Sequence, residues 1–256
     1  MRTLTFLLAM LLPPMVISGQ LPDPVQLMQK SRDLTMMTSL KSTMTLSIFE
    51  KNGSSRLRTI NLLSKSYGET EKRMIKFAEP AEVRGTALLI IDNDKGPDDM
   101  WIYLPALKRT RRIITTEKGK SFMSSEFSNA DMSSAPLSDF KISHLPSSGD
   151  NGEWIIESKP LDDEIASEYG YCRKITYLDK SNMKIKKIEF FNGENTMARV
   201  IEVISTQPIG ERGNYLMTEM FVKNLLNGRS SRIKYNEVNA SATIPDNAFT
   251  VENLER

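Results

Sequence analysis

The chain has 256 residues, with 34 Lys and Arg against 32 Asp and Glu, a formal net charge of +2, one His and one Cys. That charge is too small for a typical nucleic-acid-binding domain, which gathers Lys and Arg on one face. A single cysteine excludes an internal disulfide, so stability must come from a hydrophobic core, and a chain of this length can bury one large core.

The first 19 residues predict a cleavable secretory signal peptide. Arg2 precedes an apolar stretch at positions 4–12, which two prolines and two small residues follow. The stretch is too short to cross about 30 Å of hydrocarbon. Because the one cysteine, Cys172, lies far downstream, the mature N-terminus carries no site for a lipid anchor. We expect a soluble periplasmic protein in which residues 20–256 form a single domain.

The mature chain begins with a predicted helix and then changes to a strand pattern. Asp23 is placed to cap the helix and Pro24 to occupy its first position, where no N–H is needed. Apolar and polar residues then alternate across positions 43–48, and the turn Asn52-Gly53 leads into a second strand at 56–65. This pattern predicts a β-hairpin.

Similar short strands follow along most of the chain, separated by turns rich in Asn, Asp and Gly. They are expected at 71–77, 85–92, 99–104, 154–159, 171–178, 184–191, 197–204, 214–223 and 232–238. About ten short strands joined by tight turns favour one mainly β antiparallel meander over two domains.

Residues 115–152 depart from this pattern, because they mix Ser and other small residues with spaced apolar side chains such as Phe122, Met123 and Phe127. A free linker would carry fewer aromatic residues. The segment is therefore expected to form short helices and loops folded across the sheet, as a lid.

Catalytic signatures are not recognisable. His144 has no nucleophile elbow near it, and Cys172 lies in a strand-like sequence where a packed thiol is expected. The string at 117–121 resembles the end of a phosphate loop, but position 114 is Ile instead of the required Gly. Adjacent carboxylates at Asp98 and Asp99, and at 162–164, are typical of solvated turns. We predict no enzyme activity, no cofactor and no metal site.

Two almost wholly apolar strands, at 87–91 and 100–104, require cover on both faces of the sheet. We assign Leu88, Ile90, Trp101 and Tyr103 to one face. Either the strands lie between two protein layers, or one layer is incomplete and a lipid fills it. Adaptable methionines suit such a wall, and they occur at positions 36, 37, 123, 132, 197, 217 and 220.

A basic cluster, Arg109, Arg111 and Arg112, follows these strands. These arginines would either protect an edge strand from aggregation or bind an anionic headgroup or an acidic partner.

Four stretches, KFAEPAEVRGTALLIID, DDMWIYLPALKRTRRI, KGKSFMSSEFSNADM and YNEVNASATIPDNAFTVENLER, resemble the outer-membrane lipoprotein-sorting family, in the uncharacterised branch of the LolA-like superfamily. The resemblance extends over nearly the whole mature chain. It implies an incomplete, curved antiparallel β-barrel, with helices covering the open side and an apolar cavity between them.

The resemblance further implies a periplasmic carrier that binds lipoprotein acyl chains or another lipid and touches membranes only transiently. The alternative is an accessory or regulatory subunit that docks on an inner-membrane exporter of the resistance-nodulation-division (RND) type without transferring lipid. For the carrier we predict seven cavity or lid residues, Leu88, Ile90, Trp101, Tyr103, Phe122, Met123 and Phe127, with Arg109, Arg111 and Arg112 near a headgroup or partner.

Overall fold

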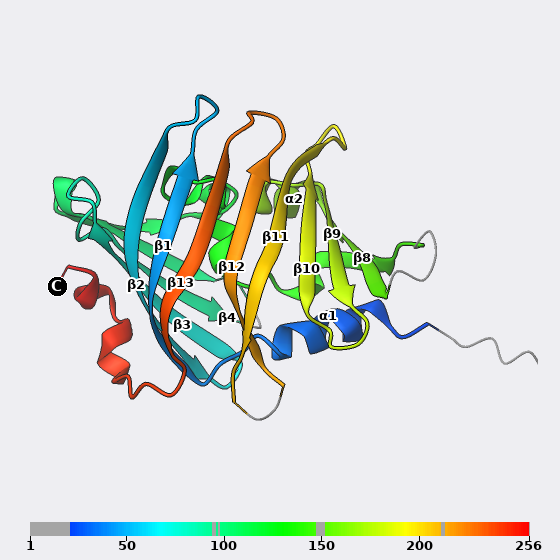
Figure 1. Ribbon diagram of the computed structural model, residues 1–256, viewed down its shortest axis with the longest axis horizontal. Coiled ribbons are helices and arrows are strands. Elements are labelled where there is room, and N and C mark those ends of the chain that lie inside the picture. The colour runs from blue at the N-terminus through cyan, green and yellow to red at the C-terminus, as the bar shows by residue number, and fades with distance from the viewer. Residues whose placement is uncertain (1–20, 94–95, 97, 147–151, 211–212, 256) are drawn as a thin grey trace, which may run out of the picture.

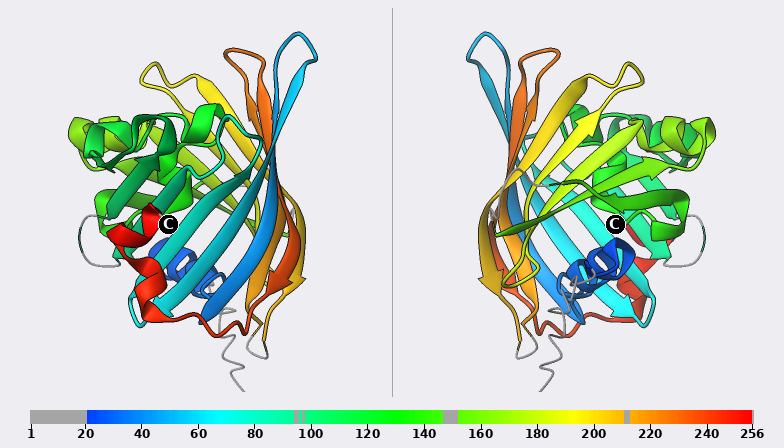
Figure 2. Two further views of the ribbon diagram at one scale, coloured as in Figure 1. Left: turned by 90° about the vertical axis from the view of Figure 1, so that its left-hand side faces the viewer. Right: turned by 90° about the vertical axis from the view of Figure 1, so that its right-hand side faces the viewer.

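The protein is built around one open, curved antiparallel sheet, in a computed structural model that describes residues 21–93, 96, 98–146, 152–210 and 213–255. The described residues form thirteen strands in the order β6-β5-β4-β3-β2-β1-β13-β12-β11-β10-β9-β8-β7. The sheet curls into a half-barrel whose edges, β6 and β7, do not pair (Figures 1 and 2). The predicted fold class is therefore confirmed. The predicted signal peptide lies outside the described residues.

The sheet consists of two meanders joined in its middle, not the one continuous meander expected. The strands are β1 (Ser39–Phe49), β2 (Ser55–Tyr67), β3 (Thr70–Glu79), β4 (Ala87–Asn93), β5 (Asp99–Leu104), β6 (Arg109–Ile113), β7 (Phe140–His144), β8 (Glu153–Pro160), β9 (Arg173–Asp179), β10 (Ile185–Phe191), β11 (Met197–Pro208), β12 (Tyr215–Asn224) and β13 (Ser230–Asn239). The first strand, β1, pairs with the last, β13, and the register sets Leu46 opposite Ile233.

The first hairpin follows its sequence pattern closely. Leu40, Met44, Leu46 and Ile48 alternate along β1 and are all buried on the concave side. Their polar neighbours face outward, as expected for a half-buried strand. The predicted turn joins β1 to β2, with Gly53 at a φ of +87°, a backbone conformation that glycine adopts without strain.

The β4–β5 hairpin is covered on both faces, but its side chains are not distributed as expected. The register sets Leu88 opposite Ile102 and Leu89 opposite Trp101. Directly opposed residues lie on the same face of a sheet, so Trp101 and Tyr103 lie on the face opposite Leu88 and Ile90. Our assignment of all four to one face was wrong, because a shared face across a hairpin depends on the register of its turn.

The outer face of this hairpin is covered by the C-terminal segment (Figure 1). Two 3₁₀ helices, η6 (Asp246–Phe249) and η7 (Val251–Leu254), carry Phe249 and Leu254 into a small core with Leu89 and Met74. Trp101 and Tyr103 pack against this core. A layer of protein, not a ligand, therefore accounts for the apolar side chains on this face.

Among the described residues, two α-helices flank the sheet. The predicted N-terminal helix is confirmed as α1 (Pro24–Asp33), and the Asp23 side chain accepts a 3.0 Å hydrogen bond from the Val25 amide. Leu27 anchors α1 on the concave side against Ile156 and Leu178. The second helix, α2 (Asp163–Tyr169), was not predicted. No helix in the described ranges is long and apolar enough to cross a membrane.

Residues 114–139, which we call the strap, connect edge strand β6 to edge strand β7 across the concave side (Figure 2). The strap carries η2 (Thr115–Glu117), η3 (Phe122–Ser124), η4 (Asn129–Met132) and η5 (Leu137–Asp139), and a further 3₁₀ turn, η1 (Pro105–Leu107), precedes β6. Short helices folded across the sheet are thus confirmed. The predicted lid, 115–152, extends too far, because β7 lies within it. Its residues 147–151 lie outside the described residues.

Candidate functional site

A cavity of about 240 Å³, which we call chamber A, lies between the strap, α1 and strands β8 to β12. Its apolar wall comes from inward-facing side chains of the sheet, from Met28 of α1 and from the strap, which contributes Phe127. The wall includes Met28, Phe140, Ile185, Ile188, Phe190, Ile201, Val203, Met217 and Met220. Unbranched methionine adapts to ligands of irregular shape, so this wall suits an apolar chain.

A second cavity of about 230 Å³, chamber B, lies deeper under β1 to β3, β12 and β13. Its apolar lining consists of Leu40, Met44, Leu62, Ile75, Leu216 and Ile233, beside Met37. Strap residues 131–134, together with Met217 and Met220, line both chambers, so the chambers are neighbours under one part of the strap. Ligand pockets usually measure about 300–1,000 Å³. Neither chamber reaches this range alone, but the two together do.

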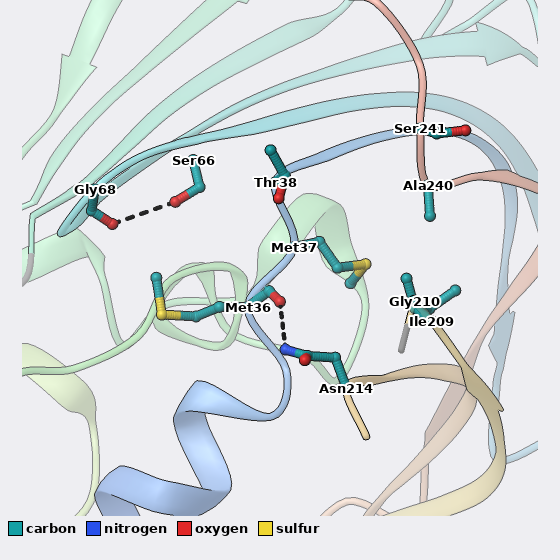
Figure 3. Close-up of a pocket in the computed structure, with 10 residues that line it drawn as sticks. All are labelled: Met36, Met37, Thr38, Ser66, Gly68, Ile209, Gly210, Asn214, Ala240 and Ser241. Carbon is teal, nitrogen blue, oxygen red and sulfur yellow. Dashed lines mark hydrogen bonds between the residues drawn. The ribbon is translucent and has the colours of Figure 1, made fainter. Parts of the chain in front are cut away.

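An open pocket of about 930 Å³ forms a mouth at one end of the half-barrel (Figure 3). It is lined by the loop between α1 and β1, the β2–β3 turn, the start of β12 and the end of β13. Met37 lines both this mouth and chamber B, so it separates the open pocket from the interior. The Asn214 amide fixes the rim, because its Nδ2 donates to the carbonyl oxygens of Asp33 at 3.0 Å and Met36 at 2.9 Å.

Arginines from the sheet and from α1 hold the strap in place. Arg73 donates to the Met132 carbonyl at 2.6 Å, Arg58 donates to Met123 and Arg32 to Ala135. Arg199 forms a bidentate ion pair with Asp131, with one of the two contacts at 3.0 Å. Because these contacts come from several elements, the strap closes the concave side as one connected layer.

The charges at the wall of chamber B form a compact group. Arg73 binds Glu71 at 2.5 Å and lies 3.5 Å from Asp92. Burial opposes ionisation of Glu71, but Arg73 outweighs it and holds the Glu71 pKa below its usual value. Burial raises the pKa of Asp92 despite Arg73. The Ser134 amide donates to Asp92 at 2.8 Å, so the group also binds the strap.

A second charged group holds the beginning of the strap. Lys118 is 4% exposed and lies 2.5 Å from Glu168 of α2 and 3.7 Å from Asp98. Burial, reinforced by Asp92, raises the pKa of Asp98 to about 6. Asp98 is therefore a buried carboxyl with a raised pKa, and not the solvated turn residue predicted from the sequence.

The residues predicted to line a cavity or lid occupy four places. Leu88, Met123 and Arg111 meet at a separate pocket of about 260 Å³ between β4, β6 and the strap. Phe127 lines chamber A, whereas Ile90 and Phe122 are buried in the main core. The remaining two, Trp101 and Tyr103, lie under the C-terminal segment.

The basic cluster lies on edge strand β6. Arg111 pairs with Glu117 at 2.6 Å and Arg112 pairs with Asp99, while Arg109 is exposed. In the part of the chain that the structure describes, no group of three or more His, Cys, Asp or Glu is arranged to hold a metal ion. The His144 ring nitrogen lies 2.7 Å from the Pro22 carbonyl oxygen.

Sequence reasoning missed most of the lining of both chambers. Several of the methionines proposed as an adaptable wall do lie there, namely Met37, Met132, Met217 and Met220. The polar residues of chamber A, above all Lys174, could not be recognised from the sequence, because Lys174 lies in a stretch that we interpreted as an ordinary strand.

An open half-barrel with a strap and a helix across its concave side is the LolA-like fold. It matches the structure of a LolA superfamily protein from Nitrosomonas europaea with a TM-score of 0.69 and 18% identity, covering 90% of this chain and 98% of that one. Residues 69–256 match the model of a family described as uncharacterized protein, and the chain belongs to that family. The recognition made from the sequence motifs is therefore confirmed.

Two further solved structures are more similar. An outer membrane lipoprotein-sorting protein domain from Vibrio parahaemolyticus has a TM-score of 0.81 and 26% identity, over 91% of this chain and 98% of that chain. A DUF1329 family protein from Desulfovibrio piger has a TM-score of 0.80 and 24% identity, over 91% of this chain and 100% of that chain. The comparison with curated proteins gives no match.

Proposed function

We propose that this protein is a periplasmic carrier that shelters an acyl chain, of a lipoprotein or of another lipid, in chambers A and B. The observation that carries the proposal is the pair of neighbouring apolar chambers enclosed between the concave sheet and the strap, with Met37 between chamber B and an open mouth. The similarity to a lipoprotein-sorting domain supports it. The role requires binding and release but no covalent chemistry.

The energetics explain why such a carrier is needed. Removing each methylene from water is worth about 0.8 kcal/mol, so exposing a chain of sixteen carbons to water costs roughly 12 kcal/mol of free energy. An apolar cavity beneath the strap supplies much of the burial that the chain needs. Release then requires the strap to move, and much of its attachment is polar contact that water can replace.

Within this proposal, Phe127, Met217 and Met220 contact the acyl chain. The cavity or lid role predicted for Leu88 and Met123 stays a prediction, as does the role of the β6 arginines near a headgroup or partner. Docking on an RND-type exporter also stays a prediction, and it becomes the preferred role only if the chambers bind no lipid.

The first experiment is mass spectrometry of an organic extract from the protein purified from a periplasmic fraction without detergent. We expect a lipid or an acylated peptide at close to one per protein. A second measurement, displacement of a dansyl-labelled fatty acid, compares two variants. Met220→Trp fills the junction of the chambers, whereas Ile204→Trp adds the same ring at a position that is 52% exposed on the neighbouring strand.

We expect Met220→Trp to weaken acyl binding at least tenfold and Ile204→Trp to leave it unchanged. An empty extract together with no displacement by the unmodified protein would refute the carrier function. Equal binding by both variants would refute the chambers as the binding site.

A further inference from the structure

Chamber A has a polar corner where strands β8 and β9 form its wall, separate from the polar residues that α1 and the strap contribute. Lys174 on β9 lies directly opposite Ser158 on β8 in the sheet register. Thr176 follows two residues after Lys174 and so faces the same side. All three residues line the chamber. The corner therefore presents one ammonium group and two hydroxyl groups to the cavity.

The hydroxyl groups have no hydrogen-bond partner among the described residues. Ser158 Oγ and Thr176 Oγ1 belong to side chains of residues that are each 1% exposed, and neither finds a donor or acceptor there. An unsatisfied buried hydroxyl costs about 1–3 kcal/mol, so proteins rarely retain one without a use. Two of them on the same face of neighbouring strands point to a polar group that the chamber receives.

The ammonium group of Lys174 is also available to bind a ligand. In the described part of the chain Lys174 has contacts with aromatic rings but no ion pair, and its Nζ lies 5.2 Å from the centre of the Phe140 ring and 5.8 Å from that of Tyr171. Phe140 and Tyr171 line the same chamber. A partly buried cation without a carboxylate is unusual, and an anion entering the chamber would supply the missing charge.

The charges around Lys174 also favour an anion. Arg32 approaches from α1 and Arg199 from β11, and the nearest carboxylate, Asp131 of the strap, is already engaged by Arg199 in a bidentate pair. Burial, together with Arg32, lowers the pKa of Lys174 to about 8. The ammonium form persists at neutral pH, so the corner is cationic where a ligand would bind.

We propose that Lys174, Ser158 and Thr176 form a headgroup site for an oxyanion, the carboxylate or phosphate of a single-chain amphiphile. The ammonium group and the two hydroxyl groups donate to the oxygen atoms, and the chain extends along the apolar wall toward Met217 and Met220. This inference rests on the proposed carrier function and narrows it to anionic, single-chain cargo.

The test compares ligands that share a chain and differ in the headgroup. Palmitic acid, hexadecyl phosphate, neutral hexadecanol and inorganic phosphate are titrated against the full protein by displacement of a dansyl-labelled fatty acid and by calorimetry. We expect one or both anionic amphiphiles to bind at least tenfold more tightly than hexadecanol, and which of them binds more tightly identifies the headgroup. Inorganic phosphate alone should bind at least a hundredfold more weakly.

Variants locate the effect at the corner. Lys174→Met should remove the preference for an anion while retaining hexadecanol binding, whereas Lys223→Met removes the same charge from an exposed position on β12 and should change neither. Thr176→Val and Ser158→Ala should weaken palmitate binding three- to tenfold. Because each removes an unsatisfied hydroxyl, neither should lower the unfolding midpoint. If Lys174→Met folds poorly, these two variants still test the headgroup site.

Palmitate affinity should also fall between pH 7 and pH 9.5, as Lys174 loses its proton, while hexadecanol affinity stays constant. Equal binding of palmitate and hexadecanol would overturn the headgroup site and leave the carrier function standing. Failure of every acyl ligand to bind would overturn both. Inorganic phosphate binding as tightly as hexadecyl phosphate would overturn the assignment to an amphiphile.

Discussion

Arg73 is the best place to test whether the strap is held by buried charge. Its guanidinium binds Glu71 at 2.5 Å, lies 3.5 Å from Asp92 and donates to the strap carbonyl of Met132 at 2.6 Å. Burial opposes the charged guanidinium, but Glu71 and Asp92 outweigh it and hold the Arg73 pKa above its ordinary value. Arg73→Met would leave two carboxylates close together without their cation.

The expected cost is large because both carboxylates would remain. Removing one partner of a buried ion pair costs about 3–5 kcal/mol. Since 22% of the Arg73 side chain is exposed, we expect the lower end, about 3 kcal/mol in the free energy of unfolding. Replacing Glu71 by Gln as well should recover at least about 1 kcal/mol, because the excess negative charge is then smaller.

Urea unfolding followed by circular dichroism measures the loss, and amide hydrogen exchange at residues 132–135 measures strap opening. Arg56→Met is a matched control, since Arg56 pairs with Glu50 at 2.6 Å but its side chain is 50% exposed. An exposed pair is worth less than about 1 kcal/mol. If Arg73→Met lost no more stability than Arg56→Met and left strap exchange unchanged, the reasoning about buried charge would be refuted.

Two further predictions concern packing and pH. Gly119→Ala should lower the free energy of unfolding by about 1–3 kcal/mol, because a Cβ there would lie 2.8 Å from the backbone nitrogen of Gly170. Gly193→Ala is the control, since a Cβ at that position would have no atom within 4 Å. It should cost less than about 1 kcal/mol in the same urea assay. Burial raises the pKa of Asp98 to about 6, so the folded state binds this proton more tightly than the unfolded state, and the free energy of unfolding falls as pH rises from about 4 to about 6. Asp98→Asn should remove about 2–3 kcal/mol of that fall, at about 1.4 kcal/mol per pKa unit; an identical pH profile for both proteins would contradict the assignment.

Local sequence chemistry predicted the central strands well. Alternation of period two and Asn-Gly turns located both strands of the first hairpin, and β5 spans the 99–104 range that was predicted. The edge strands were missed for physical reasons. β6 and β7 are five residues each, and the sequence RTRRI of β6 is almost wholly polar, as edge strands often are. Five residues are too few to establish a hydrophobic period, even in β7, where Phe140 and Ile142 alternate with polar residues.

Helix α2 was missed in the sequence for a different reason. Its N-cap, Asp162, accepts a 2.8 Å hydrogen bond from the Ile165 amide, yet we interpreted residues 162–164 as a solvated turn. Asp serves turns and helix caps equally well, and only seven residues follow before Gly170 ends the helix in the left-handed conformation. So short a helix is specified by its contacts with the strap more than by its own sequence.

The candidate site was harder to predict because a cavity is a property of packing between distant segments. Inward-facing apolar residues were identifiable, but whether they meet a neighbour or a void depends on the register of thirteen strands. Lys174 illustrates the point. In the sequence it is one cation in an alternating strand, and only the pairing of β9 with β8 sets it opposite Ser158.

The strap itself divides into two parts that are held by different kinds of contact. Phe122 and Phe127, each 1% exposed, anchor its first half in the core, and withdrawing each would cost about 1.5–3 kcal/mol, because apolar surface would enter water. The second half, residues 132–135, lines the chambers and is held by hydrogen bonds to the charged groups of Arg73, Asp98 and Asp92, each worth about 1.5–3 kcal/mol, and water can solvate these polar groups when the segment opens. A carrier that must both enclose and release its cargo would therefore open at residues 132–135, above both chambers, while the phenylalanines keep the first half fixed. Hydrogen exchange that is faster at 132–135 than at 122–127 would agree with this order, and the reverse would contradict it.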